Sequence, residues 1–412
     1  MAGSIYGEVT DWATDFDHAD PAYNRDAHRI WDDLRHRCPV AHSPRYGGVW
    51  LPVTHEFVRE IAYDTDHFSS NGVVVGTVRS DVPPPAGSGP PITSDPPFHR
   101  HARRVLLPAF APRRISASED DIRALCRRRL DDMGPIAPGA TIIDASVQYA
   151  RYLPANVMAR ILGFPPEDDH LFLGFVHDLL EAINLPPAEQ RPRRDRLDAY
   201  IDRQIEDHRQ HPRDDLTSYL MNATIFDKPL SHTHVQGSIT LLLLAGIDTT
   251  WSAIGSAIWH FASHPADLER LQADPQLMTT AIEELLRAYA PVTMARIVAE
   301  DHNFHGCPMK AGDWVLLPFP AANRDPAAFE DADQVVLDRQ INRHAAFGLG
   351  IHRCLGSNLA RLELRVALEE FIARFPAFEL ADPDAVRWSV GQIRGPRELP
   401  IRVITAREPH SA

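Results

Sequence analysis

The feature that most constrains this 412-residue chain is a long helical stretch near its middle. Ser231 is a suitable helix cap, and no proline follows before Pro265, so a helix is predicted from Ser231 to about Ser263. At 1.5 Å per residue it would span roughly 50 Å, long enough to cross the whole molecule. The rest of the chain is therefore expected to pack around one central helix.

The middle of that helix carries residues that a plain core helix does not need. Four leucines, residues 241–244, are followed by Ala245 and Gly246, and then by Asp248 and Thr249. Glycine lowers helix stability, and a buried carboxyl or hydroxyl group costs free energy unless it is hydrogen-bonded. A local helix cap at Asp248 is one explanation, and a functional site is the other.

A second feature is the glycine-rich loop of residues 347–356, which delivers Cys354 to the start of another predicted helix. Its glycines permit backbone angles and close approaches that a Cβ atom would forbid. A cysteine near a helix N-terminus is expected to favour the thiolate, which is a strong metal ligand. A lone cysteine is more often a small buried hydrophobic residue, so the surrounding pattern has to decide.

That pattern, Phe-x-x-Gly-x-His-x-Cys-x-Gly, resembles the haem-binding loop of the cytochrome P-450 monooxygenases. The long helix is similar to the family in its Ala245-Gly246-Ile247-Asp248-Thr249 motif. The resemblance extends from about Trp31 to Ile404. It implies a mainly α fold with a small β region, in which haem b lies between the long central helix and the cysteine loop. It also implies a single domain over residues 1–412, with about the first 25 residues peripheral.

The resemblance implies roles for residues around the haem. Cys354 would be the iron ligand, and a thiolate there would donate electron density that favours O–O cleavage. A helix is predicted to start with Asp95 as its cap and Pro96 at its first position. On it, His99 and Arg103 share one face and match the family's propionate ligands, although alone they could form a solvated basic face. The remaining haem contacts implied are Arg296, Phe347, Gly348, His352 and Ala245.

A further motif concerns the scaffold. Glu284 and Arg287 are three residues apart on a predicted helix, a spacing that is common on exposed helices. The resemblance implies instead that this pair is buried and joined by Arg339 from a later segment.

The implied reaction uses O2 and two electrons to oxidise an organic substrate. Thr249 would order water at the distal oxygen, Asp248 would relay protons, and Gly246 would belong to a helix distortion that makes room for dioxygen. Electrons would come from a ferredoxin and its reductase, docking near Arg103, Arg104, Arg343 and Arg353. A peroxide-using enzyme of the same fold, and a haem sensor or electron carrier, are the alternatives.

The substrate is expected to lie between the long helix and a covering loop, residues 71–93. Helical spacing and the resemblance predict an aliphatic lining, with Gln392 and Thr293 as the evident hydrogen-bonding groups and Arg79 as a possible cation. We expect a neutral, compact, apolar substrate such as a terpenoid or small aromatic, with polyketide- or steroid-like molecules as the alternative. The lining residues are Leu241, Leu244, Ala245, Val292, Met294 and Ile393, the last in a turn that begins at Val390.

Composition supports a protein of the cytoplasm. The formal net charge is −14, which argues against nucleic-acid binding. The four cysteines lie far apart, so no disulfide framework or zinc site is indicated. No signal peptide begins the sequence, and its longest apolar run is too short to span a membrane. A soluble monomer is expected.

Overall fold

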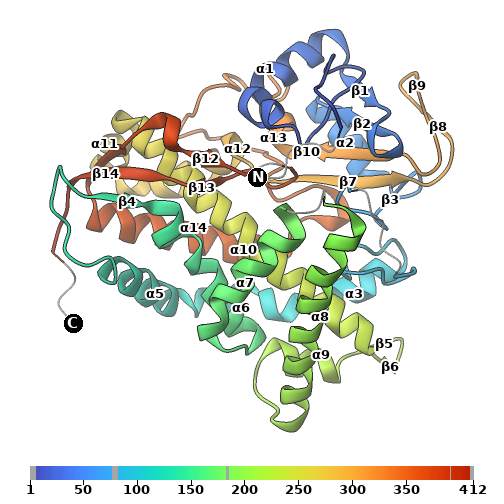
Figure 1. Ribbon diagram of the computed structural model, residues 1–412, viewed down its shortest axis with the longest axis horizontal. Helices are drawn as coiled ribbons and strands as arrows, with labels where there is room; N and C mark the ends of the chain where they lie inside the picture. The colour runs from blue at the N-terminus through green and yellow to red at the C-terminus, as the bar shows by residue number, and fades with distance from the viewer. Residues whose placement is uncertain (1–5, 77–81, 182–184, 390, 409–412) are drawn as a thin grey trace.

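The computed structural model describes residues 6–76, 82–181, 185–389 and 391–408 (Figure 1). Most of these residues form helices, and a smaller part forms short strands, which confirms the mainly α fold predicted from the sequence. The α-helices are α1 (Pro21–Arg37), α2 (His55–Tyr63), α3 (Phe98–Leu106), α4 (Pro112–Ser116), α5 (Glu119–Asp131), α6 (Tyr152–Leu162), α7 (Asp169–Val176), α8 (Pro187–Gln210), α9 (Leu216–Asn222), α10 (His232–Ser263), α11 (Pro265–Ala273), α12 (Met278–Ala288), α13 (Phe319–Ala322) and α14 (Ser357–Arg374).

The largest sheet has the strand order β1-β2-β10-β7-β3, in which β2 and β10 run parallel and the other neighbours antiparallel. A second sheet has the order β11-β14-β4, and three two-stranded ribbons complete the β structure. The strands are β1 (Val40–Ser43), β2 (Val49–Pro52), β3 (Phe68–Ser69), β4 (Ile142–Asp144), β5 (Thr224–Ile225), β6 (Lys228–Pro229), β7 (Thr293–Val298), β8 (His302–Phe304), β9 (Cys307–Met309), β10 (Trp314–Pro318), β11 (Ala377–Leu380), β12 (Arg387–Trp388), β13 (Pro396–Glu398) and β14 (Pro400–Thr405).

Helix α10 crosses the centre of the molecule and packs against α6, α7, α8 and α14 (Figure 1). The Ser231 side chain accepts a hydrogen bond from the His234 N–H, so the predicted cap starts this helix. Among the described residues, α10 alone is long and apolar enough to cross a membrane, but 67% of its most apolar window is buried inside the protein. Its length and apolar composition are therefore explained by its position as the core helix of the fold.

The N-terminal segment packs more tightly than expected. Residues 1–25 were predicted to be peripheral, yet the side chains of Phe16 and Asp17 are fully buried. The Asp17 carboxylate accepts hydrogen bonds from Tyr46 and Arg45, which ties the segment to the loop before β2. From residue 6 onward, the segment therefore covers part of the core next to the large sheet.

The expected Asp95 cap of α3 is not formed. The helix begins at Phe98 without a side-chain cap, because the Asp95 carboxylate accepts hydrogen bonds from the Ser69 hydroxyl and the Ser70 N–H instead. Asp95 thus holds β3 beside the start of α3.

The Glu284 carboxylate accepts hydrogen bonds from several separate segments of the chain. It is fully buried and accepts two hydrogen bonds of 2.8 Å from Arg287 and one of 2.9 Å from Arg339. The Val336 N–H and the Asn342 side chain also donate to it. The contact between Arg339 and Glu284 expected from the sequence is therefore present.

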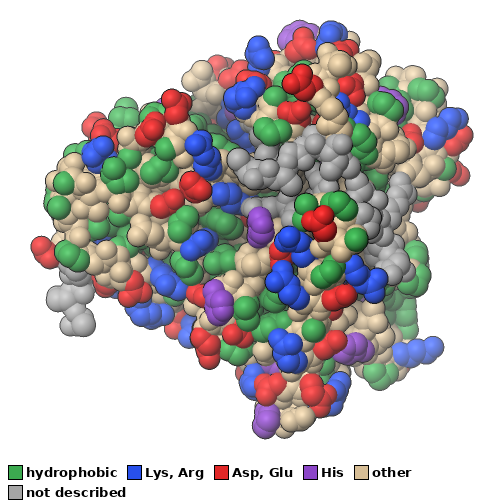
Figure 2. Space-filling view, in the orientation of Figure 1, with side chains coloured by type: hydrophobic (Ala, Val, Ile, Leu, Met, Phe, Trp, Pro, Cys, Tyr) green, Lys and Arg blue, Asp and Glu red, His purple; other side chains and the backbone are tan. Residues whose placement is uncertain are grey.

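Basic and acidic side chains are interspersed on the face shown in Figure 2. The net charge of −14 is thus not gathered into one acidic region of this face. Such mixing keeps the surface hydrated without a strong field of one sign.

Glu363 of α14 is a buried acid, and among the described residues no cation lies close enough to lower its pKa. Its side chain is almost inaccessible, and Oε2 has no hydrogen-bond partner among the described residues. Burial raises the pKa of this carboxyl group from 4.5 to about 8. The folded protein therefore holds the proton over a pH range in which the unfolded chain releases it.

This proton should make stability depend on pH. Because the pKa of Glu363 is raised in the folded state, the contribution of the protonated side chain to the free energy of unfolding is complete below pH 4.5. This contribution is lost as pH rises toward about 8. We predict that Glu363→Gln removes a decline of up to ~1.4 kcal/mol per pH unit in the free energy of unfolding. Urea unfolding at several pH values measures it, with the exposed Glu269→Gln as control. An unchanged slope in Glu363→Gln would contradict the assignment.

Candidate active site

The loop that carries Cys354 is fixed by its own backbone. The Cys354 N–H donates to the Phe347 carbonyl oxygen over 2.7 Å, which closes the loop just before α14. Gly350 has a φ of +67°, and a Cβ there would lie 2.4 Å from the Ala62 carbonyl oxygen. Only glycine lets the loop pass so close to the end of α2. Gly348 also has a positive φ, of +70°, so the loop needs glycine at both turns.

The Cys354 thiol does not favour the thiolate by position alone. Cys354 is exposed to solvent by surface area. Many protein atoms nevertheless surround the thiol, and the resulting desolvation raises its pKa. A hydrogen bond from the Gly356 N–H and the charge of Arg103 act in the opposite direction but do not outweigh burial. The prediction that the helix start favours the thiolate is therefore wrong for the protein alone, because burial dominates. A bound metal ion would supply the missing positive charge.

Two histidines meet at this loop. His99 of α3 lies against His352, with the ring centroids 4.3 Å apart. Burial and the charge of Arg103 lower the pKa of His99 to about 4. Burial and the charge of Arg296 lower the pKa of His352 to about 2. Both imidazoles are therefore neutral near pH 7, and both stand beside fixed cations.

Those cations are Arg103 and Arg296. Arg296 lies in β7 and is buried, which lowers its pKa to about 10. It donates to the adjacent Ala295 carbonyl oxygen over 2.7 Å. Arg103 of α3 donates to the carbonyl oxygen of Arg353 over 2.6 Å, directly beside Cys354. Two separate elements thus bring positive charge to one loop.

This cluster fits the two carboxylates of a haem. Within the described part of the chain, His99 Nε2 is a buried polar atom without a hydrogen-bond partner. The buried Arg296 guanidinium donates to a backbone carbonyl oxygen, and the charge of Asp95 offsets its desolvation only in part. Carboxylates accept charge-assisted hydrogen bonds from such groups. The residues predicted as propionate ligands, His99, Arg103 and Arg296, are therefore brought together with His352 and Cys354.

The centre of α10 presents a small residue and a hydroxyl group on one face. Ala245 is exposed, although Leu243 and Ile247 on either side are fully buried. The Thr249 hydroxyl donates to the Ala245 carbonyl oxygen over 2.7 Å, so the two residues lie one above the other. Helix α14, which follows Cys354, packs against α10.

Gly246 has a packing role. A Cβ at this position would lie 2.6 Å from the Met158 sulfur of α6. The absence of a side chain therefore lets α6 and α10 approach closely, and α10 continues as a single helix through this point.

Asp248 is fully buried and held by a residue that sequence reasoning missed. Its Oδ1 accepts a 2.6 Å hydrogen bond from Arg397 of β13. The same guanidinium group donates to the Ser252 hydroxyl over 3.0 Å and lies over the Trp251 ring. Arg397 is distant in sequence and belongs to no motif, so nothing local pointed to it. Asp248 is not a helix cap.

One predicted pocket residue, Leu241, lies near the covering loop. A Cβ at Gly89 would be 3.6 Å from Leu241, and the Ser238 hydroxyl donates to the Pro90 carbonyl oxygen over 3.1 Å. The end of the loop therefore rests on the first half of α10. Leu244 is half-buried on the same helix.

The other predicted pocket residues lie at the start of β7 and in the turn before β13. Val292 and Ile393 form a β-bridge, and Met294 follows in β7. All three side chains are partly exposed within otherwise buried surroundings. Arg79 and Val390 lie outside the described residues.

The prediction that Gln392 offers its amide to a substrate is wrong. Its side-chain oxygen accepts from the Val75 N–H over 2.6 Å, and its nitrogen donates to the carbonyl oxygens of Thr293 and Val73 over 2.8 and 3.3 Å. The amide is therefore used to hold the covering loop against β7. The lining is left more apolar than the sequence indicated.

Comparison with known proteins agrees with this arrangement. Residues 169–386 match the family model described as Cytochrome P450. Mycinamicin IV hydroxylase/epoxidase of Micromonospora griseorubida is 32% identical over 379 residues, which cover 90% of this chain and 94% of that protein. Putative cytochrome P450 126 of Mycobacterium tuberculosis is 34% identical over 397 residues, 93% of each chain.

Solved structures are equally similar. The crystal structure of CYP109E1 from Bacillus megaterium in complex with testosterone has a TM-score of 0.83 at 30% identity, covering 92% of this chain and 98% of that chain. The polyketide synthase cytochrome P450 PksS of Bacillus subtilis has a TM-score of 0.84 at 28% identity, covering 95% and 100%. The chain belongs to the cytochrome P450 family. It is a P450 monooxygenase, and its cofactor is haem b.

Proposed function

We propose that this enzyme oxidises a small apolar organic substrate, with Cys354 as the thiolate ligand of the haem iron and Arg103, Arg296 and His99 holding the propionates. The observation that supports this most is the convergence of α3, β7 and the Cys354 loop. Arg103 donates to Arg353, and His99 contacts His352. When bound, the haem supplies oxygen activation and hydrogen removal from the substrate. We propose further that residues 1–412 act as one cytoplasmic, monomeric domain.

The cysteine assignment has a direct spectroscopic test. Cys354→Ala should lose the far-red-shifted Soret band of the reduced carbon-monoxide complex, because no other sulfur stands at that loop. The matched control is Cys307→Ala, a half-buried free cysteine in β9. A shifted band in Cys354→Ala equal to that of the unmodified enzyme would refute the proposal.

We propose that Thr249 and Asp248 deliver protons to the oxygen substrate. The Thr249 hydroxyl already lies on the face of α10 that includes exposed Ala245, where it can hold a water molecule. Asp248 cannot reach bulk solvent while Arg397 holds it at 2.6 Å, so it must rotate away from the guanidinium group to exchange its proton. Arg397 is then the group that holds the Asp248 carboxylate in place between turnovers.

These two roles predict different defects. Thr249→Ala should bind haem and substrate but release most electrons as hydrogen peroxide, whereas Thr249→Ser, which keeps the hydroxyl, should stay coupled. Asp248→Asn should instead slow turnover by about 10²-fold, the usual size of a lost proton-transfer group. Product formed per electron consumed, together with kcat, separates them. Full coupling in Thr249→Ala would place the relay elsewhere.

The electron donor is proposed to be an acidic ferredoxin that docks beside the Cys354 loop. Arg104, Arg343 and Arg353 are exposed and have no acidic partner in the described ranges. The alternatives are a peroxide-using enzyme, which would need no donor, and a haem sensor or electron carrier. The buried Asp248 and the Thr249 hydroxyl argue against the sensor or electron carrier, which has no use for a proton relay, whereas the peroxide-using enzyme is distinguished by its independence of an electron donor.

Turnover with a ferredoxin system is therefore expected to exceed turnover with peroxide alone. Charge reversal at Arg104 and Arg353 should slow reduction by ~10-fold at low salt, because rim charges act mainly on association rate. The effect should shrink as salt is raised. The control is Arg29→Glu on α1, an exposed arginine in another part of the fold. Equal slowing in the control, or none in either, would exclude this docking face.

The substrate proposal rests on the lining. With the Gln392 amide used internally, Leu241, Leu244, Val292, Met294 and Ile393 leave a surface suited to shape recognition of an apolar molecule. Some similar structures contain larger molecules. One is a mutant of P450 EryK in complex with erythromycin B, and it supports the alternative of a polyketide- or steroid-like substrate. A compound panel scored by loss of iron-bound water in the optical spectrum distinguishes the two classes.

A further inference from the structure

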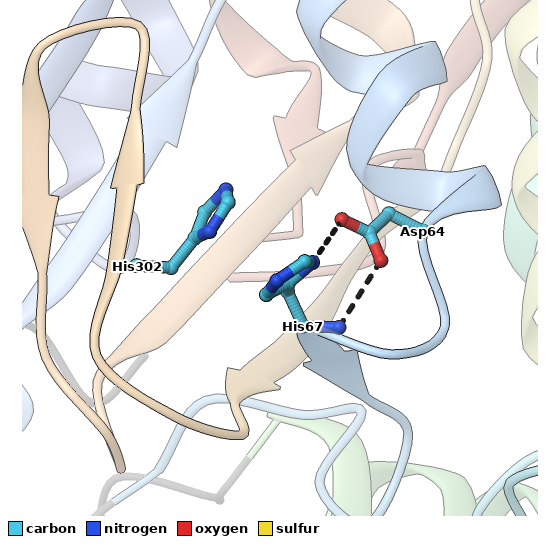
Figure 3. Close-up of side chains that lie close together, drawn as sticks. All are labelled: Asp64, His67 and His302. Carbon is cyan, nitrogen blue, oxygen red and sulfur yellow. Dashed lines mark hydrogen bonds and ion pairs between the residues drawn. The ribbon is translucent and has the colours of Figure 1, made fainter.

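A cluster of metal-ligand side chains lies outside the haem site, at the edge of the large sheet (Figure 3). Asp64 caps the end of α2, His67 precedes β3, and His302 is the first residue of β8. Each offers one ligand atom, and these atoms lie within 4.8 Å of one another. All three side chains are half-buried, so they are fixed by protein on one side and open to solvent on the other.

The backbone holds His67 in place. The Ala299 N–H donates to the His67 carbonyl oxygen over 2.8 Å, and Phe68 pairs with Val298 in the sheet. The Asp64 Oδ1 accepts the His67 N–H over 3.1 Å, which closes the turn between α2 and β3. The position of His67 thus depends on main-chain contacts and not on its imidazole.

His302 is held by a different element. It opens the β8–β9 hairpin, in which it pairs with Met309. Its ring lies over that of His67, with centroids 4.1 Å apart and an interplanar angle of 32°. The ring nitrogens of His302 make no hydrogen bond to any residue that the structure describes. They are therefore available to a ligand.

The imidazole of His67 is oriented for coordination. Its Nδ1 lies 2.7 Å from Asp64 Oδ2, and Figure 3 shows this contact together with the backbone bond to the same carboxylate. Nε2 is left to coordinate, and it lies 3.8 Å from Oε1 of Glu300. A carboxylate on the distal nitrogen is the usual partner of a metal-bound histidine, because it fixes the ring and raises its basicity.

The cluster could also be explained without a metal ion, as two imidazole rings that pack at the surface with one hydrogen bond to Asp64. Such packing accounts for the contact between Asp64 and His67. It gives no reason for a second imidazole stacked on the first, nor for a second carboxylate at the other nitrogen of His67. Two imidazoles and a carboxylate with a further carboxylate behind them form a ligand set that suits zinc and similar ions.

We propose that this chain binds one divalent transition-metal ion of the zinc class at this cluster, separate from the haem. His67 Nε2 and a ring nitrogen of His302 are the nitrogen ligands, and the Glu300 carboxylate supplies oxygen. Asp64 is a positioning residue that acts through His67. The Glu300 side chain is 75% exposed, so it can swing toward the ion without disturbing the core. His67 Nε2 and Glu300 Oε1 lie 3.8 Å apart, so one ion can lie about 2 Å from each of them.

The test uses the haem-loaded, full-length protein, stripped with a chelator and titrated with Zn²⁺ alone against a chromophoric competitor. We expect one tight equivalent. His302→Ala should weaken it by at least ~100-fold, and Asp64→Asn by ~10–100-fold, the range measured for partners behind metal ligands. The matched control is His305→Ala, because His305 lies on the same hairpin but pairs with Glu60 at 2.9 Å. It should bind zinc normally.

The chain has 21 histidines, so nonspecific binding has to be separated from this site. Equal affinity in His302→Ala and the unmodified protein, or equal weakening in His305→Ala, would overturn the proposal. Glu300→Gln provides a second variant at an exposed position, where folding is not at risk. As an independent readout, Zn²⁺ should raise the unfolding temperature of the unmodified protein and of His305→Ala but not of His302→Ala. A rise of the same size in all three would also contradict the site.

Discussion

The position of the haem loop depends on one buried carboxylate, that of Glu284. It accepts from Arg287 and Arg339 and from the Val336 N–H, and Arg287 in turn donates to the carbonyl oxygens of Ala332 and Gln334. These contacts replace the regular secondary structure that the chain lacks between α13 and the Cys354 loop. A buried charge is costly unless every oxygen is satisfied, so the segment has little freedom to adopt another path. Cys354 is consequently delivered to a fixed place just before α14, the helix that packs against α10.

The opposite arrangement surrounds the residues proposed as propionate ligands. There, the charge of Asp95 offsets the burial of Arg296 only in part. Burial lowers the pKa values of Arg296, His99 and His352, the last two to about 4 and about 2. The protein alone is therefore electrostatically unfavourable at this point, and an anionic group that arrives between these side chains relieves the cost. We therefore expect haem binding to stabilise the fold, because binding to the folded state alone shifts the folding equilibrium.

Sequence patterns predicted the elements whose signals are local. Ser231 and Pro265 mark the two ends of α10, as their positions in the sequence indicated. The errors lie where a side chain has two possible partners. Asp95 could cap α3 but bonds to Ser69 and Ser70 instead, and no local rule ranks these options. Arg397 reaches Asp248 from β13 across 149 residues, a contact that only the folded chain creates.

Strand β3 shows how closely the two proposed sites are connected. His67 stands before it, and the Ser70 hydroxyl after it lies 2.9 Å from His352 Nε2. Between them, Ser69 and Ser70 bond to Asp95, and Phe68 pairs with β7. The short strand is thus already fixed at both ends before any ion binds. A metal at His67 and His302 would therefore add to the stability of this edge of the sheet and leave the backbone beside the haem loop where it is.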